Sequence, residues 1–157
     1  MCDLGGEQVE EIPGADAVSR HIDFPFRFSD AEDLIWENAF MFSGGTGESV
    51  IWRRDQPEIA DVHALGCVQQ ARKRPAKPNW KYVGAITATV STVRAIANRR
   101  GNGFEVEHHP EDGQGQHHAE IHRRKTDNPV LKSEKGELLM MLRDAFGPLE
   151  QHECPAI

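Results

Sequence analysis

The chain has 157 residues, of which 38% are hydrophobic and 27% are charged, with a formal net charge of −7. This length suits one domain that buries its own core. The sequence has no run of about 18 apolar residues, which excludes a membrane-spanning helix, and its first residues lack the basic and apolar regions of a signal peptide. We therefore expect a cytoplasmic protein that does not insert into a membrane.

The three cysteines, Cys2, Cys67 and Cys154, are spread along the chain without a Cys-x-x-Cys pair. An odd number at such spacing argues against a disulfide framework and against a zinc site built on cysteine. We expect three reduced thiols.

The charge is unevenly distributed. Residues 1–50 carry 2 basic and 11 acidic side chains, residues 51–125 carry 13 and 8, and residues 126–157 carry 3 and 6. An acidic beginning beside a basic middle is compatible with a middle segment that binds anions. A solvated surface with clustered charges is the alternative.

The N-terminal part is predicted to hold a tail, an extended segment and a short helix. Residues 1–17 are acidic, so we expect a flexible tail. Phenylalanines alternate over residues 22–28, as in a strand, and Pro25 indicates that this segment is an edge strand or an extended arm. A capping-box pattern at Ser29 predicts a helix over residues 30–38.

The middle of the chain alternates between predicted strands and helices. Alternating apolar residues predict a strand over residues 48–54, and aromatic and β-branched residues predict another over 80–89. Between them, a proline near the start and basic residues near the end indicate a helix over residues 55–74. Ser91 is the expected cap of a shorter helix over residues 92–100.

The C-terminal third is predicted to contain a hairpin and a helix. Strands over residues 104–109 and 117–122 are joined by the turn-rich segment 110–116. Ser133 is the expected cap of a last helix, which stops before Gly147.

Together these elements predict an α+β fold with a mostly antiparallel sheet packed with three or four short helices, because helices and strands alternate irregularly and turns are frequent. We expect a single domain over residues 18–148, between the flexible acidic tail of residues 1–17 and a loose tail over residues 149–157.

The hairpin concentrates histidines, since five of the eight lie within it: His108, His109, His117, His118 and His122. Because side chains alternate along a strand, one face of the hairpin is apolar and the other gathers Glu105, Glu107, His109, His118, Glu120 and His122. Imidazole and carboxylate groups suit a divalent metal such as zinc or manganese, which can activate water. The candidate metal ligands are His109, His118, Glu120 and His122, and the candidate catalytic residues are Glu107 and His118. A solvated polar face, or a histidine that acts without a metal, is the alternative.

The run from Glu107 to Pro110, followed by His118 and His122, resembles the ββα-metal motif of the HNH nucleases. This resemblance implies a metal-dependent nuclease. The sequence departs from the motif because the loop between the strands has only seven residues and because the helix that carries the last ligand is missing.

Three segments look similar to a set of short uncharacterised bacterial proteins: the Ser-Val strand that begins at Ser49, the strand from Tyr82 to Val90 followed by Arg94, and the His-Ala strand from His117 to Ile121. The resemblance covers roughly residues 34–122 and implies no activity. It implies that Ser49, Arg94 and His118 converge on one ligand-binding site, where a hydroxyl, a guanidinium and an imidazole suit an anion. The alternative is that Ser49 pairs locally and Arg94 lies on a helix surface.

Two further segments bear on nucleotides and nucleic acids. Residues 44–47 are glycine-rich but lack the Gly-Lys-Ser/Thr ending of a phosphate loop, which excludes a nucleoside triphosphatase of that type. Residues 72–82 mix cations with aromatic residues, as in a nucleic-acid-binding segment, although a helix end followed by a solvated loop explains them equally well. The acidic overall balance weighs against general affinity for nucleic acid.

The sequence therefore favours a small bacterial or phage accessory protein that binds a protein partner or a small anionic ligand. The alternative is a metal-dependent hydrolase, of nuclease or phosphodiesterase type, with its site on the hairpin.

Overall fold

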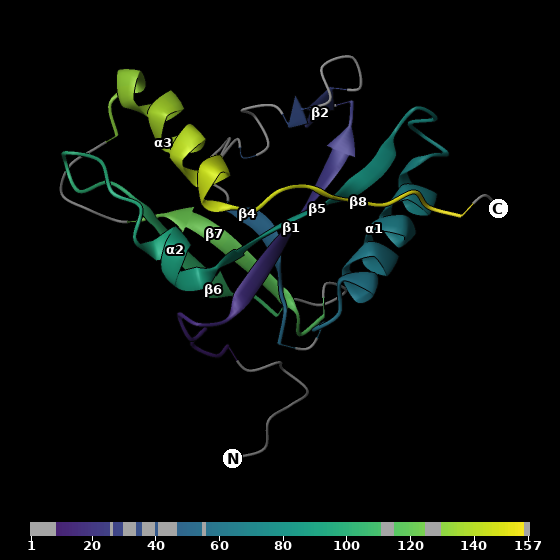
Figure 1. Cartoon of the computed structure of the whole chain (residues 1–157), viewed down its shortest axis with the longest axis horizontal. Helices are drawn as coiled ribbons and strands as arrows, with labels where there is room; N and C mark the ends of the chain where they lie inside the picture. The colour runs from purple at the N-terminus through teal and green to yellow at the C-terminus, as the bar shows by residue number, and fades with distance from the viewer. Residues whose placement is uncertain are drawn as a thin grey trace.

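The computed structural model describes residues 9–25, 27–29, 34–35, 40, 47–54, 56–110, 115–124 and 130–155. Within them, six strands form one sheet in the order β6-β7-β4-β1-β5-β8, and each neighbouring pair is antiparallel (Figure 1). These strands are β1 (Ala17–Phe24), β4 (Glu48–Trp52), β5 (Lys81–Thr89), β6 (Phe104–His108), β7 (His118–Arg123) and β8 (Glu150–Gln151). The other described elements are the strand pair β2 (Phe28–Ser29) and β3 (Leu34–Ile35) and the helices α1 (Ile59–Lys73), α2 (Val90–Arg94) and α3 (Lys132–Ala145). The fold is α+β with an antiparallel sheet, as predicted.

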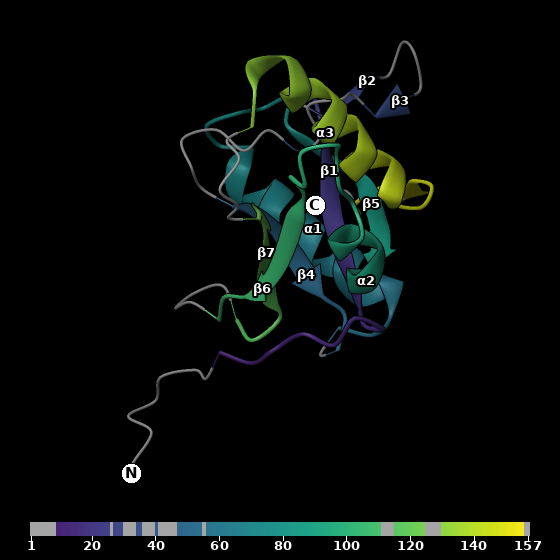
Figure 2. The same cartoon turned by 90° about the vertical axis from the view of Figure 1, so that its left-hand side faces the viewer.

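The sheet has an apolar face and a mixed face. Val50 and Trp52 of β4 belong to the main core together with Leu138 of α3, whereas Ile51 between them packs with Val62 of α1. Because consecutive strand residues point to opposite faces, α3 and α1 cover opposite sides of the sheet (Figures 1 and 2). We call these sides the α3 face and the α1 face.

The helix α1 lies mainly against β5 and β1. It begins after Pro57 and carries Arg72 and Lys73 in its last turn, where cations favour the helix dipole, as predicted. The helix does not pack mainly on β4, β7 and β6, which form the rest of the α1 face.

The hairpin of β6 and β7 has the predicted alternation. Its register places Glu107 opposite Glu120 and Glu105 opposite His122, so these four side chains start from the same face. The other face is buried: it consists of the core residues Phe104, Val106, Ala119 and Ile121 and of His108, which is 2% exposed and lies opposite Ala119.

The predicted helix over residues 30–38 is wrong at Leu34 and Ile35, which form β3 and pair with β2. Pairing with a neighbouring apolar segment outweighs the capping pattern because local helix propensity is a weak preference. The other residues of that range lie outside the described residues. The helix predicted over residues 92–100 is also displaced: it forms α2, where the hydroxyl of Thr89 rather than Ser91 accepts the capping hydrogen bond.

The chain ends included in the description are held by the domain, in contrast with the expected tails. Ile12 is buried in the main core, and Asp16 accepts a hydrogen bond from the indole of Trp52 over 2.8 Å. At the other end, β8 pairs with β5, and a Cβ at Gly84 would lie 2.2 Å from the carbonyl oxygen of Glu150. Only glycine therefore allows β8 to approach β5 so closely.

A disulfide joins Cys67 of α1 to Cys154, which follows β8. This corrects the expectation of three reduced thiols. The two cysteines are 87 residues apart in sequence and meet because α1 and β8 both pack against β5. A long-range contact of this kind cannot be predicted from the number or the spacing of the cysteines. Cys2 lies outside the described residues.

None of the helices in the described part of the chain has both the length and the apolar character needed to cross a bilayer.

Candidate functional site

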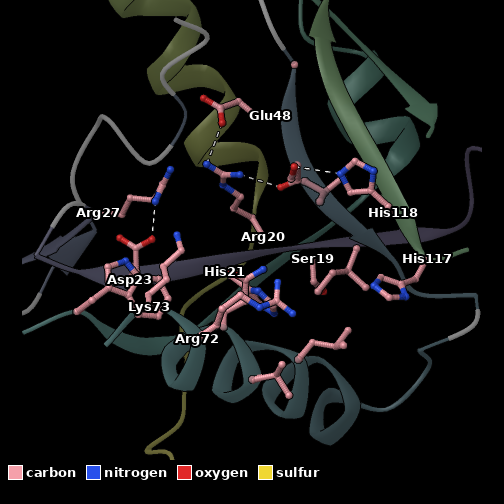
Figure 3. A pocket seen from close by; sticks show the side chains of 18 residues that line it. Ser19, Arg20, His21, Asp23, Arg27, Glu48, Arg72, Lys73, His117 and His118 are labelled. Atoms are coloured by element: carbon pink, nitrogen blue, oxygen red, sulfur yellow. Dashed lines mark hydrogen bonds and ion pairs between the residues drawn. The ribbon is translucent and has the colours of Figure 1, made fainter. Parts of the chain in front are cut away.

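The α1 face holds a cavity of about 410 Å³ beside the helix α1 (Figure 3). Its walls come mainly from β1, β4, α1 and the start of β7. The polar lining consists of the cations Arg20, Arg27, Arg72 and Lys73, the carboxylates Asp23 and Glu48, the imidazoles of His21, His117 and His118, the hydroxyls of Ser19 and Ser49, and the amide of Gln69. Four cations and two carboxylates give this lining a net charge of +2 with neutral imidazoles. We call it the cationic cavity.

Ser49 and His118 form a hydrogen-bonded pair in the wall of the cationic cavity. The Nδ1–H of His118 donates to the carbonyl oxygen of His109 over 2.7 Å, which leaves Nε2 of the neutral ring as an acceptor. The hydroxyl of Ser49 donates to that Nε2 over 3.1 Å. Ser49 is exposed and His118 is buried. An imidazole oriented in this way can accept the proton of a hydroxyl that bonds a ligand.

Arg20 closes a gap between β1 and β4. The pairing of these strands covers only Val18 with Trp52 and Ser19 with Ile51. Beyond it, the guanidinium of Arg20 donates to the carbonyl of Ser49 over 2.8 Å and to Glu48 over 2.9 Å. Burial lowers the pKa of Arg20 to about 10, so the side chain stays charged at neutral pH and supports the strand that carries Ser49.

Asp23 and Arg27 form an ion pair that also lines the cavity. Asp23 is only 4% exposed, and its Oδ1 and the Nε of Arg27 are buried without a hydrogen-bond partner. Leaving such a polar atom unsatisfied costs roughly 1–3 kcal/mol. A polar ligand or a water molecule that reaches these atoms would recover part of that energy.

Two further groups set the electrostatics of the cavity. The Nε2–H of His21 donates to the carbonyl of Val62 over 2.9 Å, and burial lowers the pKa of His21 to about 4, so this imidazole is neutral at physiological pH. Partial burial lowers the pKa of Lys73, while the charge of Asp23 opposes this effect. The ammonium group of Lys73 lies 4.8 Å from the ring centre of Trp80.

A second polar group lies farther along the α1 face, on the hairpin. Nε2 of His109 is 3.3 Å from Nε2 of His122 and 3.4 Å from Oε2 of Glu107, which is 3.7 Å from Nε2 of His122. Glu120 lies 3.7 Å from each imidazole through its two oxygens. We call Glu107, His109, Glu120 and His122 the hairpin cluster.

The hairpin cluster has the dimensions of a metal site. The point equidistant from the three closest ligand atoms, one each from Glu107, His109 and His122, lies about 2.0 Å from each of them, and zinc binds imidazole and carboxylate ligands at roughly 2.0–2.2 Å. Two imidazoles and one carboxylate leave further coordination positions of such an ion open.

Gly47 lies between the two sites. It lines the cationic cavity, and a Cβ at this position would lie 2.6 Å from Cε1 of His122 and 2.7 Å from Oε1 of Glu120. The residue before β4 therefore needs to be small for the hairpin cluster to keep its arrangement.

The structure divides the predicted site residues between these two places. His109 and His122 lie close together, as predicted, and the third group within reach of a shared ion is Glu107, which was expected as a base. Glu120 lies 3.7 Å from each of the two imidazoles. His118 instead bonds Ser49 and the backbone of the hairpin.

Arg94 does not join Ser49 and His118. Its guanidinium pairs with Glu105 and donates to the carbonyls of Ile12 and Val106, and it is not among the residues that line the cationic cavity. Arg94 of α2 thus links the edge strand β6 to the N-terminal segment around Ile12.

Sequence reasoning missed the residues of β1 that line the cavity. Val18 and Ile22 alternate with Ser19, His21 and Asp23, which is the pattern of a strand with one polar face. That signal was present, but the phenylalanines that follow suggested a strand four to five residues later in the chain. Arg72 and Lys73 are predicted from the sequence as a helix end or as part of a nucleic-acid-binding segment, and neither prediction places them beside Ser49.

The chain matches no protein-family model, no curated protein and no solved structure.

Proposed function

We propose that this chain is a small accessory protein that binds a small anionic ligand in the cationic cavity. The observation that carries the proposal is the gathering of Arg72, Lys73 and the Ser49–His118 pair around one cavity of net positive charge. Cations and hydroxyls bind phosphate and carboxylate groups through charge-assisted hydrogen bonds. The sequence predicts an anion site made by Ser49, Arg94 and His118. We propose that Arg72 and Lys73 supply its positive charge instead of Arg94.

The size of the cavity favours a small molecule over the other partners expected from the sequence. A volume of about 410 Å³ lies in the range of small-molecule sites, whereas a protein partner or a nucleic acid needs a more extended surface. A cytoplasmic location belongs to the same proposal. The disulfide of Cys67 and Cys154 weighs against it, because disulfides persist mainly in oxidising compartments.

The test measures the binding of inorganic phosphate by calorimetry in wild-type protein and in two double variants. In Arg72→Ala/Lys73→Ala we expect affinity to fall at least tenfold, because both cations line the cavity. The matched control, Lys132→Ala/Lys135→Ala, removes the same charge from exposed positions of α3 and should bind as wild type does. Equal losses in both variants would indicate a general charge effect and would contradict a cavity site.

A second function, a metal-dependent hydrolase, is favoured by the geometry of the hairpin cluster. We propose Glu107, His109 and His122 as ligands of a zinc or manganese ion, which would lower the pKa of a bound water. Glu120, whose side chain is 16% exposed against 55% for Glu107, is then the proposed base. The two glutamates therefore exchange the roles expected from the sequence, because a single oxygen of Glu107 lies 3.4 Å from Nε2 of His109 and 3.7 Å from Nε2 of His122, whereas Glu120 reaches the two rings through different oxygens, each 3.7 Å away.

Manganese binding to oxidised protein tests this second function, with hydrolysis of bis(p-nitrophenyl) phosphate as the activity. We expect one ion per chain in wild type and none in His109→Ala/His122→Ala. The variant His118→Ala is the matched control, since it removes an imidazole from the same strand outside the hairpin cluster, and it should keep the ion. Loss of metal in His118→Ala, or retention in the double variant, would refute the assignment of ligands.

A further inference from the structure

Three side chains of metal-ligating type meet outside both sites, where the C-terminal segment packs on α1. Each of Cys67, His152 and Cys154 offers a ligand atom, and these atoms lie within 4.8 Å of one another. The Cα atoms of the two cysteines are 5.5 Å apart. All three residues are half-buried and line a second cavity of about 960 Å³, so small reagents can reach them.

The orientation of His152 is fixed by its neighbours. Its ring stacks on that of His63 with a centroid distance of 4.4 Å and an interplanar angle of 10°. His63 in turn bonds the hydroxyl of Tyr82 through Nδ1 over 2.7 Å, and the backbone N–H of His152 donates to β5 over 2.8 Å. The imidazole is therefore held beside the sulfurs independently of the disulfide.

We propose that reduction of the disulfide converts Cys67, Cys154 and His152 into a zinc site. Two monothiol molecules supply two electrons: the sulfur–sulfur bond breaks, both cysteines become thiols, and the reductant leaves as its own disulfide. A Zn²⁺ ion then displaces the two thiol protons to solvent and binds two thiolates and the imidazole, with water in the fourth position. In a reducing cytoplasm, where disulfides are rare, the zinc form replaces the disulfide as the link between α1 and the C-terminal segment.

The geometry permits this exchange without a change of fold. Tetrahedral zinc with Zn–S bonds of about 2.3 Å requires sulfurs about 3.8 Å apart, and freed cysteine side chains reach that separation by rotation about their own bonds. The backbone stays in place because the hydrogen bonds between β8 and β5 do not depend on the disulfide. The three ligands belong neither to the lining of the cationic cavity nor to the hairpin cluster. The zinc proposal is therefore independent of the proposed function, and each can be tested without the other.

Cobalt is the probe for this site, because thiolate ligands give Co²⁺ a near-ultraviolet charge-transfer band that imidazole and carboxylate ligands do not give. Wild-type protein is reduced with a phosphine, desalted without oxygen and titrated with Co²⁺, beside an oxidised sample. We expect one equivalent of thiolate-bound cobalt in the reduced sample and none in the oxidised sample, with the band abolished by added Zn²⁺. A reduced protein without this band would overturn the proposal, and this comparison needs no variant that could misfold.

Variants then assign the ligands. Cys67→Ser and Cys154→Ser should each lose the charge-transfer band of the two-thiolate site, and His152→Ala should weaken cobalt binding at least tenfold. Cys2→Ser is the matched control and should titrate as wild type does. His109→Ala/His122→Ala should also leave the thiolate band unchanged, since it removes only the hairpin cluster. A band that survives in Cys67→Ser, or that disappears in Cys2→Ser, would overturn the assignment.

Discussion

The two faces of the sheet are made by alternate residues of the same strands, and they differ in almost every physical property. On the α3 face, Trp52, Phe104 and Ile121 are at most 1% exposed and pack with α3. On the α1 face, Ile51 packs against α1, but Ser49 of β4 and the alternate positions of β6 and β7 are polar and contribute to the cationic cavity and the hairpin cluster. This contrast indicates that one face supplies most of the folding energy and thereby leaves the other face available for chemistry.

The largest expected effect comes from emptying the apolar face. Phe104→Ala removes a fully buried ring from β6 and should lower the free energy of unfolding by about 3–5 kcal/mol. Urea unfolding followed by circular dichroism measures it. Glu107→Gln, three residues along the same strand on the α1 face, should change stability by no more than about 0.5 kcal/mol. Similar losses of unfolding free energy in both variants would contradict the conclusion that the α3 face supplies most of the folding energy.

The next effect is the response of the α1 face to acid. Burial lowers the pKa of His21 to about 4 in the folded protein, against about 6.5 in the unfolded chain. Between these values the unfolded chain binds a proton that the folded protein does not, so stability is retained above pH 6.5 and falls by up to about 3 kcal/mol as the pH drops to 4.

The variant His21→Gln tests this pH dependence, because glutamine keeps an N–H donor for the carbonyl of Val62 but does not titrate. Urea midpoints measured from pH 7 to pH 4 should fall less steeply in the variant than in wild type. Parallel curves would show that His21 does not control acid stability.

A smaller effect is expected where α1 meets the sheet. A Cβ at Gly66 would lie 2.5 Å from the ring of Tyr82, so Gly66→Ala forces the helix or the ring to move and should cost about 1–3 kcal/mol. Alanine favours helices by up to about 1 kcal/mol over glycine, which reduces the loss but does not remove it. Thermal unfolding measures the difference, with Gly136→Ala as the control, because a Cβ at Gly136 of α3 meets no atom within 4 Å. Gly136→Ala should be neutral or stabilising.

The hairpin shows what could be predicted from the sequence. Its alternation assigned Phe104 and Ile121 to the core and Glu107, His109 and His122 to one opposite face, as the register confirms. Strand alternation is a local property, so a single sequence reveals it.

The cavity, the role of Arg94 and the disulfide depend instead on which elements become neighbours. Arg72 meets Ser49 in one lining only because α1 packs beside β1, and Cys67 meets Cys154 only because both of their segments reach β5. Within the hairpin itself, His118 left the predicted ligand set because Ser49 and the carbonyl of His109 bind both of its nitrogens. Strand alternation gives the face of a side chain but not its partner.

The smallest expected effect on stability separates the two sites of the α1 face. Gly47→Ala places a Cβ against the ends of His122 and Glu120, which are side-chain atoms that can rotate away, so the free energy of unfolding should change by about 0.5 kcal/mol or less. The rotation draws His122 away from His109 and Glu107, and manganese affinity should fall at least tenfold. Phosphate affinity should be unchanged, because Arg72, Lys73 and the Ser49–His118 pair keep their positions. If phosphate and manganese binding weaken together, the cationic cavity and the hairpin cluster are one site, and the α1 face binds a metal and an anion jointly.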